Sequence, residues 1–370
     1  MEADTKIPSR TKVRLLSLDV MRGMIMILLA GESCAVYHTI EHATGSNWFI
    51  NQFFHAPWHG LRFWDLVQPA FMLMAGSAMY ISWHYKAHSG LSWRDNFPHI
   101  LKRCIGLFVF GTALHCVYAG RLVWELWNVL TQLSITTLIA YLIIRKSFTW
   151  QLVFSLLLLM LTEALYRLIN VAGFDQAFTE HHNFGAYADT LLMGKINADG
   201  WVAINCIPTT AHTIWGVLAG RLLVSSAGPY AKVKYLVFAG LIALIAGYSL
   251  DFFSITPIIK RISTSSFVLA SGGWVLLMMA ALYWLNDIRK YQKYAWLFIV
   301  IGMNPIFIYL FFETVGAQWL NGVVKIFVGG GTGFLGIQGD VVAVVCAFMT
   351  LALEWYLCFW LYKRKIFFKL

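Results

Sequence analysis

The sequence predicts an all-α protein, a polytopic bundle of about ten transmembrane helices with both termini in the cytosol. Of its 370 residues, 59% are hydrophobic and 12% are charged, whereas soluble domains carry about 25% charged residues. The mean hydropathy is +0.65. The apolar residues are also gathered into long runs, and a run of about 20 is what a helix needs to cross a bilayer. These observations together indicate that lipid is the solvent of this chain.

The candidate spans follow one another along the whole chain. Ten runs have a suitable length: 15–38, 63–84, 100–119, 124–144, 149–170, 202–223, 234–251, 265–285, 295–313 and 340–362. The stretch 317–329 is apolar but broken by glycines, so it is a candidate for a short re-entrant helix or an eleventh span. We expect one transmembrane domain at 14–363, between a cytosolic tail at 1–13 and a basic cytosolic tail at 364–370.

Basic residues predict the orientation of the helices. If the N-terminus is inside, most of the 28 lysines and arginines fall in cytosolic segments, as the positive-inside rule requires. The formal net charge of +10 is then an orientation signal, and we expect no nucleic-acid partner. The first apolar run is too long for the core of a signal peptide, so we expect it to be retained as a helix. The cysteines lie in apolar runs without framework spacing, which indicates packing roles.

The side opposite the basic loops has a different chemistry. It carries the two longest external loops, 39–62 and 171–200, together with acidic groups. Most histidines of the chain gather there: His38, His42, His55, His59, His181 and His182, with His115 nearby. A polar, histidine-rich vestibule above an apolar bundle predicts a site that handles a polar substrate outside the cytosol.

Ionisable residues inside the predicted spans are functional candidates, because burying a charge in lipid is costly. Glu32 lies near the outer end of the first span, where it either faces the vestibule or serves chemistry. Asp19 and Arg22 are three residues apart and suit an ion pair on one helix face, unless Arg22 binds an anionic ligand from the cytosol. Glu163 and Arg167 are four apart and suit a structural pair.

His55 is the strongest candidate for catalysis. A neutral imidazole accepts a proton from an amine or hydroxyl near pH 7, and a neighbouring carboxylate orients the ring and stabilises the imidazolium. Asp65 and Glu32 are the candidate carboxylates. The structural alternative is a histidine of the interfacial aromatic belt beside Trp58.

Zinc binding is a further interpretation of the same histidines. His38 and His42, like His55 and His59, have the i,i+4 spacing that suits zinc on a helix. The sequence has neither an HExxH motif nor a Cys/His set, so we expect no metal.

Several ordered segments then resemble one family. They are Arg14-Leu-Leu-Ser-Leu-Asp-Val-Met-Arg-Gly23; His55-Ala-Pro-Trp-His-Gly60; Asp65-Leu-Val-Gln-Pro69 with Phe71-Met-Leu-Met-Ala-Gly76; Tyr187-Ala-Asp189 with Leu191-Leu192; Ile207-Pro208 through Gly216-Val-Leu-Ala-Gly220; Pro257-Ile-Ile-Lys260 with Thr264-Ser-Ser-Phe267; and Gly302-Met-Asn304 with Tyr309. The set resembles the heparan-alpha-glucosaminide N-acetyltransferase family, over residues 14 to about 310. Each segment alone is weak, and their order makes the resemblance specific.

The resemblance implies a multi-pass acetyltransferase of a bacterial inner membrane. Such proteins use cytosolic acetyl-CoA as co-substrate to acetylate a glucosamine amine, as on heparan sulfate, across the membrane. The catalytic histidine of the family falls on His55, and Glu32 stands where animal members have an asparagine. The segment Leu130-Thr131-Gln132 lacks the arginine of the family, and Ile259 replaces an asparagine.

The resemblance and the charge pattern together assign the remaining site residues. Coenzyme A is expected at Arg22, Lys102, Arg103 and Asn304. The amino sugar or glycan acceptor is expected at Asp189, Lys260 and Trp58.

Two other functions fit parts of the sequence. A sugar or glycan transporter or flippase without covalent chemistry also suits a ten-helix bundle with buried polar groups, although the inverted repeats expected of that class are not visible. A metal-dependent hydrolase would use the histidine cluster. Because any exposed helix face can serve as an interface, a homodimer is a candidate assembly.

Overall fold

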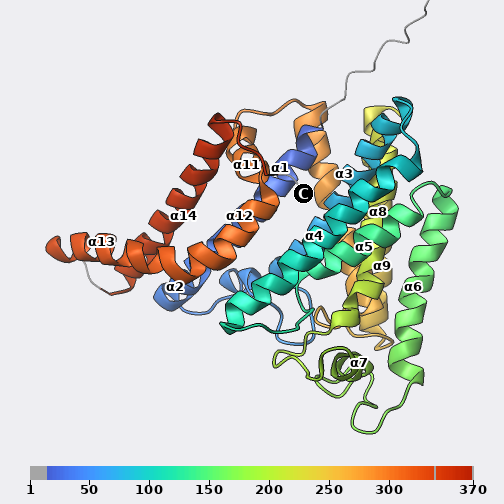
Figure 1. Cartoon of the computed structure of the whole chain (residues 1–370), viewed down its shortest axis with the longest axis horizontal. Helices are drawn as coiled ribbons and strands as arrows, with labels where there is room; N and C mark the ends of the chain where they lie inside the picture. Colours follow the sequence, from blue (N-terminus) through green and yellow to red (C-terminus); the bar gives the residue numbers. More distant parts are fainter. Residues whose placement is uncertain (1–14, 337–338, 369–370) are drawn as a thin grey trace, which may run out of the picture.

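The computed structural model describes residues 15–336 and 339–368, and all regular elements in that part of the chain are helices (Figure 1). The predicted tail at 1–13 lies outside the described residues. The main helices are α1 (Leu16–Ser33), α2 (Val36–Thr44), α3 (Val67–His88), α4 (Trp93–Ala119), α5 (Val129–Leu142), α6 (Phe148–Leu168), α7 (Phe184–Met193), α8 (Cys206–Val224), α9 (Pro229–Phe252), α10 (Ser265–Leu282), α11 (Ala295–Gly302), α12 (Pro305–Phe311), α13 (Asn321–Phe334) and α14 (Asp340–Lys363).

Short helical segments complete the chain. Three of them are 3₁₀ turns, and two are π-helical stretches that extend α10 and join α12 to α13. They are η1 (Ile50–Phe53), η2 (Phe63–Leu66), η3 (Ala203–Asn205), η4 (Tyr283–Ile288) and η5 (Phe312–Leu320).

The membrane character of the chain is supported by the length and apolarity of its helices. Within the described residues, α4, α6, α9, α10 with η4, and α14 are long and apolar enough to cross a membrane. Two bent pairs raise the number of candidate spans from 5 to 7. Every predicted span coincides with at least one helix, so the apolar runs located the helices correctly.

Three predicted spans do not meet the same criterion, and each has a physical reason. The helix α5 has 14 residues, about 21 Å at 1.5 Å per residue, which is shorter than the hydrocarbon core. The helices α3 and α8 are longer but carry more polar side chains. Both lie largely inside the bundle, where most residues of α8 are buried. A helix surrounded by other helices need not be uniformly apolar.

Two predicted spans are broken in the structure. The run 15–38 bends by 62° between α1 and α2, where Ala35 adopts a left-handed backbone with φ of 58°. The run 295–313 bends by 77° between α11 and the helix that begins at Pro305. That second helix continues through η5 and α13, so 317–329 is not a separate re-entrant helix.

Close packing of α3 against α8 forms the centre of the bundle. Gly76 lies against the backbone carbonyl of Thr213, and Gly216 lies against that of Leu73. A side chain at either glycine would collide with the facing backbone. Small residues at such crossings allow helices to approach closely in a membrane, and this contact holds α3 in place.

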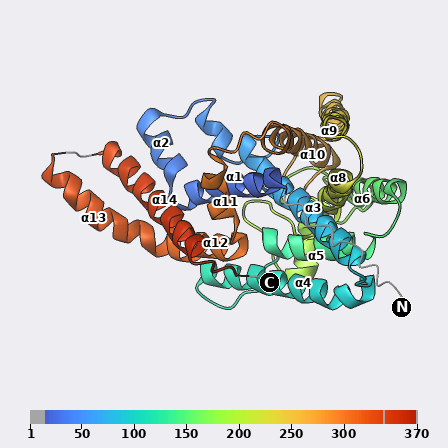
Figure 2. The ribbon, with the colours of Figure 1, turned by 90° about the horizontal axis from the view of Figure 1, so that it is seen from above.

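The two ends of the bundle differ in structure as well as in sequence. We call the end where α1 begins the basic end, because lysines and arginines lie in or beside its loops 89–92, 143–147, 225–228 and 289–294. The opposite end is called the histidine end. It holds α7 and the long loops around it, at the bottom of Figure 1. In Figure 2, α13 and α14 lie at one edge of the molecule, far from α6 and α9.

Candidate active site

A cavity of about 370 Å³ opens at the histidine end. It contains predicted site residues from distant parts of the sequence, together with a rim of aromatic side chains. The lining residues used below are Glu32, His38, His55, Trp64, Gln68, Phe71, Trp127, Val129, Gln132, Trp201, Lys260, Tyr309 and Glu313. A mixed aromatic and ionisable lining of this kind is typical of a site for a polar small molecule.

A fully buried carboxylate holds His55 in place. The Nδ1 of His55 is 2.8 Å from Oδ1 of Asp65. The other oxygen, Oδ2, accepts hydrogen bonds from the backbone amides of Arg62, at 2.9 Å, and Ala56, at 3.3 Å. The Asp65 carboxylate therefore joins η2, in which Asp65 lies, to the preceding loop that carries His55. Its carboxylate favours the tautomer with the proton on Nδ1, which leaves Nε2 as a base.

Lys260 lies beside the hydrogen bond between His55 and Asp65. Its Nζ is 3.1 Å from Nδ1 of His55 and 3.4 Å from Oδ1 of Asp65. It also lies 5.6 Å from the ring of Trp201. The lysine comes from the turn 257–264 between α9 and α10, where the Thr264 side chain caps α10. The sequence separates this residue from His55 by 205 positions, and the fold brings them into contact.

Burial and charge tune the three groups for proton transfer. Burial and, to a lesser extent, the Lys260 ammonium lower the pKa of His55 to about 4, against the opposing effect of Asp65. Burial alone would raise the pKa of Asp65, but the hydrogen bond from His55 and the charge of Lys260 hold that pKa below its usual value. Burial lowers the pKa of Lys260 to about 8. At neutral pH the cluster therefore holds a neutral imidazole, a carboxylate and an ammonium.

Aromatic rings enclose His55. Its ring lies 5.4 Å from that of Trp201 and 6.2 Å from that of Trp64, both edge-on. Trp127 lines the same cavity, and its Nε1 donates to the buried Oδ2 of Asp189 at 2.6 Å. Flat apolar faces around polar groups suit a sugar ring, which presents both C–H and O–H surfaces.

Two carboxylates from the membrane helices face the same cavity. Glu32 lies at the end of α1, with Oε1 at 3.5 Å from His38, and its buried Oε2 has no hydrogen-bond partner among the described residues. Glu313 lies in the π-helical η5 and accepts a hydrogen bond from Tyr118 at 2.6 Å. Glu32 and His55 share the cavity without a hydrogen bond between them.

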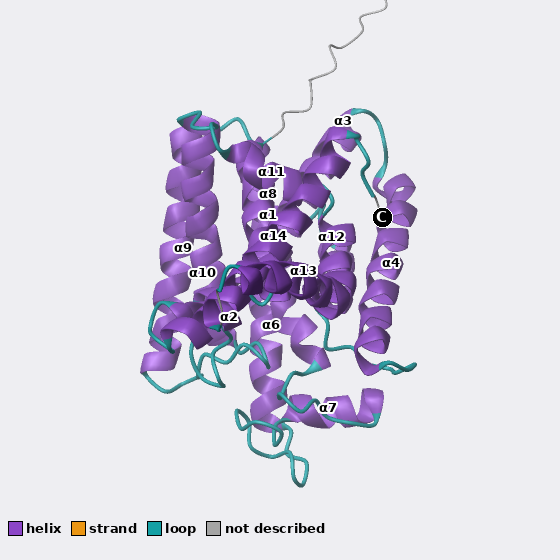
Figure 3. Cartoon of the chain, turned by 90° about the vertical axis from the view of Figure 1, so that its left-hand side faces the viewer, coloured by secondary structure: helices purple, strands orange, loops and turns teal. Residues whose placement is uncertain are grey.

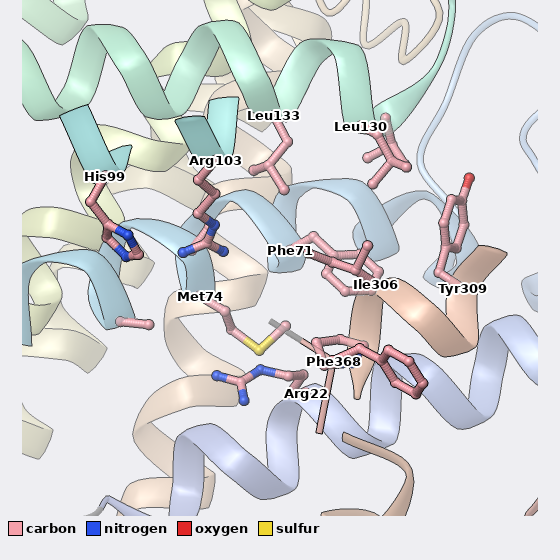
Figure 4. Close-up of a pocket in the computed structure, with 14 residues that line it drawn as sticks. Arg22, Phe71, Met74, His99, Arg103, Leu130, Leu133, Ile306, Tyr309 and Phe368 are labelled. Atoms are coloured by element: carbon pink, nitrogen blue, oxygen red, sulfur yellow. The ribbon is translucent and has the colours of Figure 1, made fainter. Parts of the chain in front are cut away.

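A second cavity, of about 360 Å³, lies toward the basic end. Figure 4 shows Arg22 from α1 and Arg103 from α4 extending into it, with Met74 between them in this view. His99 adds a third nitrogen-bearing side chain, and the remaining walls are largely apolar. Guanidinium groups at one end of an apolar pocket suit a ligand that joins phosphate to a hydrocarbon-like arm.

The two cavities meet at three shared residues. Phe71 of α3, Val129 of α5 and Tyr309 of α12 line both. Figure 4 shows Phe71 and Tyr309 on the side of the second cavity away from His99. A pocket with two arginines and a pocket with His55 therefore lie back to back inside the bundle.

Other predicted site residues have different contacts. Lys102 is exposed and does not line the second cavity. Asn304 is buried, donates to the Ile366 carbonyl at 2.9 Å and accepts from the Phe368 amide at 2.9 Å. It therefore fixes the C-terminal segment, whose Phe368 lines the second cavity.

The predicted acceptor residues divide in the same way. Lys260 lines the first cavity, whereas Trp58 and Asp189 do not. Trp58 donates to the Phe178 carbonyl at 2.9 Å. Asp189 accepts from Trp127 and from the Ala203 amide, and burial raises its pKa to about 6.

The histidines proposed for zinc are paired with different carboxylates. The pairs are His38 with Glu32, His42 with Asp340, His55 with Asp65 and His59 with Asp251. No group of three or more histidine, cysteine or acidic residues suited to a metal occurs in residues 15–336 and 339–368.

The sequence-predicted ion pairs are present. Arg167 lies 3.0 Å from Glu163, and Arg22 lies 3.6 Å from Asp19. The six cysteines are unpaired, and five of them are buried. The Glu163–Arg167 pair expected from helix spacing and the burial of most cysteines are confirmed, and anion binding by Arg22 stays a prediction.

The sequence interpretation missed Trp127, Trp201 and Glu313. Glu313 carried a usable signal, because it is an acidic residue at the end of a predicted span. The two tryptophans carried none, since aromatic residues are frequent at every membrane interface of this chain. Comparison with protein-family models and with curated proteins gives no match, so the geometry of the two cavities is the basis for a functional proposal.

Proposed function

We propose that this chain is a membrane-embedded acyltransferase that moves an acetyl group from acetyl-CoA to an amino sugar or glycan on the other side of the bilayer. The observation that carries the proposal is the pair of cavities separated by Phe71, Val129 and Tyr309. In the proposed arrangement ten spans place both termini and the basic end in the cytosol of a bacterial cell, as the distribution of lysine and arginine favours.

The second cavity is the proposed donor site. Arg22 and Arg103 bind phosphate groups of coenzyme A, and the apolar walls accommodate its pantetheine arm. The thioester then approaches the first cavity past Phe71 and Tyr309. Coenzyme A is a co-substrate here, and the proposal requires no metal.

The first cavity is the proposed acceptor site. A neutral amine attacks the thioester carbonyl while Nε2 of His55 accepts its proton. The new C–N bond forms, the C–S bond breaks, and the proton passes from His55 to the departing thiolate. Asp65 stabilises the imidazolium, and the Lys260 ammonium stabilises the oxygen that becomes negative. An acyl group carried on His55 before transfer is consistent with the same geometry.

Replacing His55 tests the proposal directly. We expect His55→Ala to lower the rate of acetyl transfer by at least about 100-fold, the lower range for general acid–base catalysis, while coenzyme A binding is retained. His59→Ala is the matched control, because His59 lies on the same loop but pairs with Asp251. Transfer from labelled acetyl-CoA to glucosamine is the measurement. Full activity of His55→Ala would refute the assignment.

A transporter also explains two cavities placed back to back. The two functions differ in the fate of the label. Purified protein in liposomes, with acetyl-CoA on one side and an amino sugar on the other, yields N-acetylated sugar if the protein is an acyltransferase. Movement of unmodified sugar without acetylation would favour the transporter.

A further inference from the structure

We propose that a groove beside the candidate active site binds an anionic membrane lipid, with the lipid phosphate on Arg62. The groove has a volume of about 550 Å³ and is separate from the two cavities described above. Leu66, which precedes α3, Met278 of α10 and Tyr248 of α9 contribute to its walls. This site is independent of the acyltransferase proposal, because it requires only a lipid and not a reaction.

The position of the groove points to a lipid. The helices α9 and α10 pack side by side at one edge of the bundle in Figure 3. The groove residues Trp274 and Ala281 are exposed and lie two turns apart on α10, about 10 Å along the helix. A groove of this length on an outer helix suits a hydrocarbon chain.

The charge at one end of the groove indicates the class of lipid. Arg62 is the single charged lining residue among those that the structure describes. It is half-buried, and no carboxylate of the described residues lies within ion-pair distance of its guanidinium. Arginine binds phosphate through paired N–H donors. Tyr248 and Trp274, joined by a 3.2 Å hydrogen bond, are residues that favour the interface between headgroups and chains.

Arg62 also connects the groove with the candidate site. Its Nη1 donates to the His55 carbonyl at 3.0 Å, and its backbone amide donates to Asp65 at 2.9 Å. A phosphate on Arg62 would therefore fix the residue that supports the His55 loop. The lipid acts on the site through this loop and does not touch the reacting groups.

Lipid binding by delipidated protein tests the inference. Native mass spectrometry would compare phosphatidylglycerol with phosphatidylcholine of identical chains, for wild-type protein and for Arg62→Gln. We expect wild type to prefer phosphatidylglycerol, and Arg62→Gln to bind it about five-fold more weakly with unchanged phosphatidylcholine binding, because the cation is removed. Arg121→Gln is the matched control, since Arg121 is exposed at the same end outside the groove.

A second variant separates the groove from folding of the His55 loop. Ala281→Trp fills the far part of the groove, and we expect it to weaken phosphatidylglycerol binding while Arg62 remains in place. Equal binding of both lipids by wild-type protein would overturn the proposal. Equal loss in Arg62→Gln and Arg121→Gln, or unchanged binding in both groove variants, would also overturn it.

Discussion

At the scale of single residues, burial and the charge of Lys260 together keep His55 neutral. Burial of the imidazole is the larger cause, and the Lys260 ammonium, 3.1 Å away, acts in the same direction, so that the pKa of His55 is lowered to about 4. Asp65 acts in the opposite direction. A base that remains neutral in mildly acidic conditions suits the proposed acyltransferase, whose acceptor site is proposed to face the outside of the cell.

Removal of this cation should move the acid limb of the pH profile. The active base is neutral His55, which predominates above its pKa, so wild-type kcat/KM, calculated for the neutral form of the acceptor amine, should be flat between pH 5.5 and 7.5. Lys260→Met should raise the pKa of His55 toward its ordinary value, so kcat/KM should fall by roughly five-fold at pH 5.5 relative to pH 7.5. The pH dependence of kcat/KM reports the pKa of the base even if Lys260→Met is slower than wild type at every pH.

Lys260→Arg is the control for this experiment. It retains a cation beside the imidazole, so its acid limb should remain close to that of wild type. At alkaline pH the two proteins should differ. Lys260 has a pKa of about 8 and loses its charge above that pH, whereas arginine does not. An acid limb in Lys260→Met identical to wild type would show that Lys260 does not control His55.

Sequence reasoning reached part of this cluster. His55 and Asp65 are ten positions apart at the mouth of one predicted helix, so their contact followed from chain proximity. Lys260 was assigned to the acceptor by resemblance, because no local pattern links residues 205 positions apart. The contact of Trp201 with His55 could not be predicted from the sequence, because it depends on how the loop after α7 folds over His55.

At the scale of elements, the contact between α3 and α8 supports the site. Gly216 faces the Leu73 carbonyl, and α3 begins two residues after Asp65. We expect Gly216→Val to destabilise the protein by about 3 kcal/mol, because the added side chain overpacks against backbone that cannot yield. Thermal unfolding in detergent is the measurement.

Gly322→Ala is the matched control for that substitution. Gly322 lies in α13 with open space around its Cα, so an added methyl group should leave stability unchanged or raise it by up to about 1 kcal/mol through helix propensity. A melting temperature of Gly216→Val equal to that of wild type would show that the two helices separate easily.

The helices themselves were the most predictable feature of this chain, and their breaks were the least. Apolar runs determine where a helix forms in lipid, so every predicted span coincides with a helix. The sequence has no proline or glycine at the bend after Ser33. Ala35 adopts the left-handed backbone conformation there, which a sequence pattern does not predict. The π-helical η5 is also invisible in the sequence, although it carries Glu313 to the first cavity.

At the scale of the whole molecule, the proposed reaction depends on the passage between the two cavities. Phe71, Val129 and Tyr309 come from three helices and line both sides. In the proposed reaction, donor and acceptor enter from opposite ends and meet at these three residues. Binding at one cavity and transfer to the other should therefore be separable by mutation.

Val129→Trp should separate them. The larger side chain would narrow the passage, so coenzyme A binding should remain within about two-fold of wild type while acetyl transfer falls by about 100-fold, the cost of misplacing a reacting group by about 1 Å. Leu133→Trp provides the contrast, because Leu133 lines only the second cavity and should weaken coenzyme A binding itself. Calorimetric binding and labelled transfer would be measured on the same preparations. If Val129→Trp transferred acetyl groups at the wild-type rate, the acetyl group would have to reach His55 by another route.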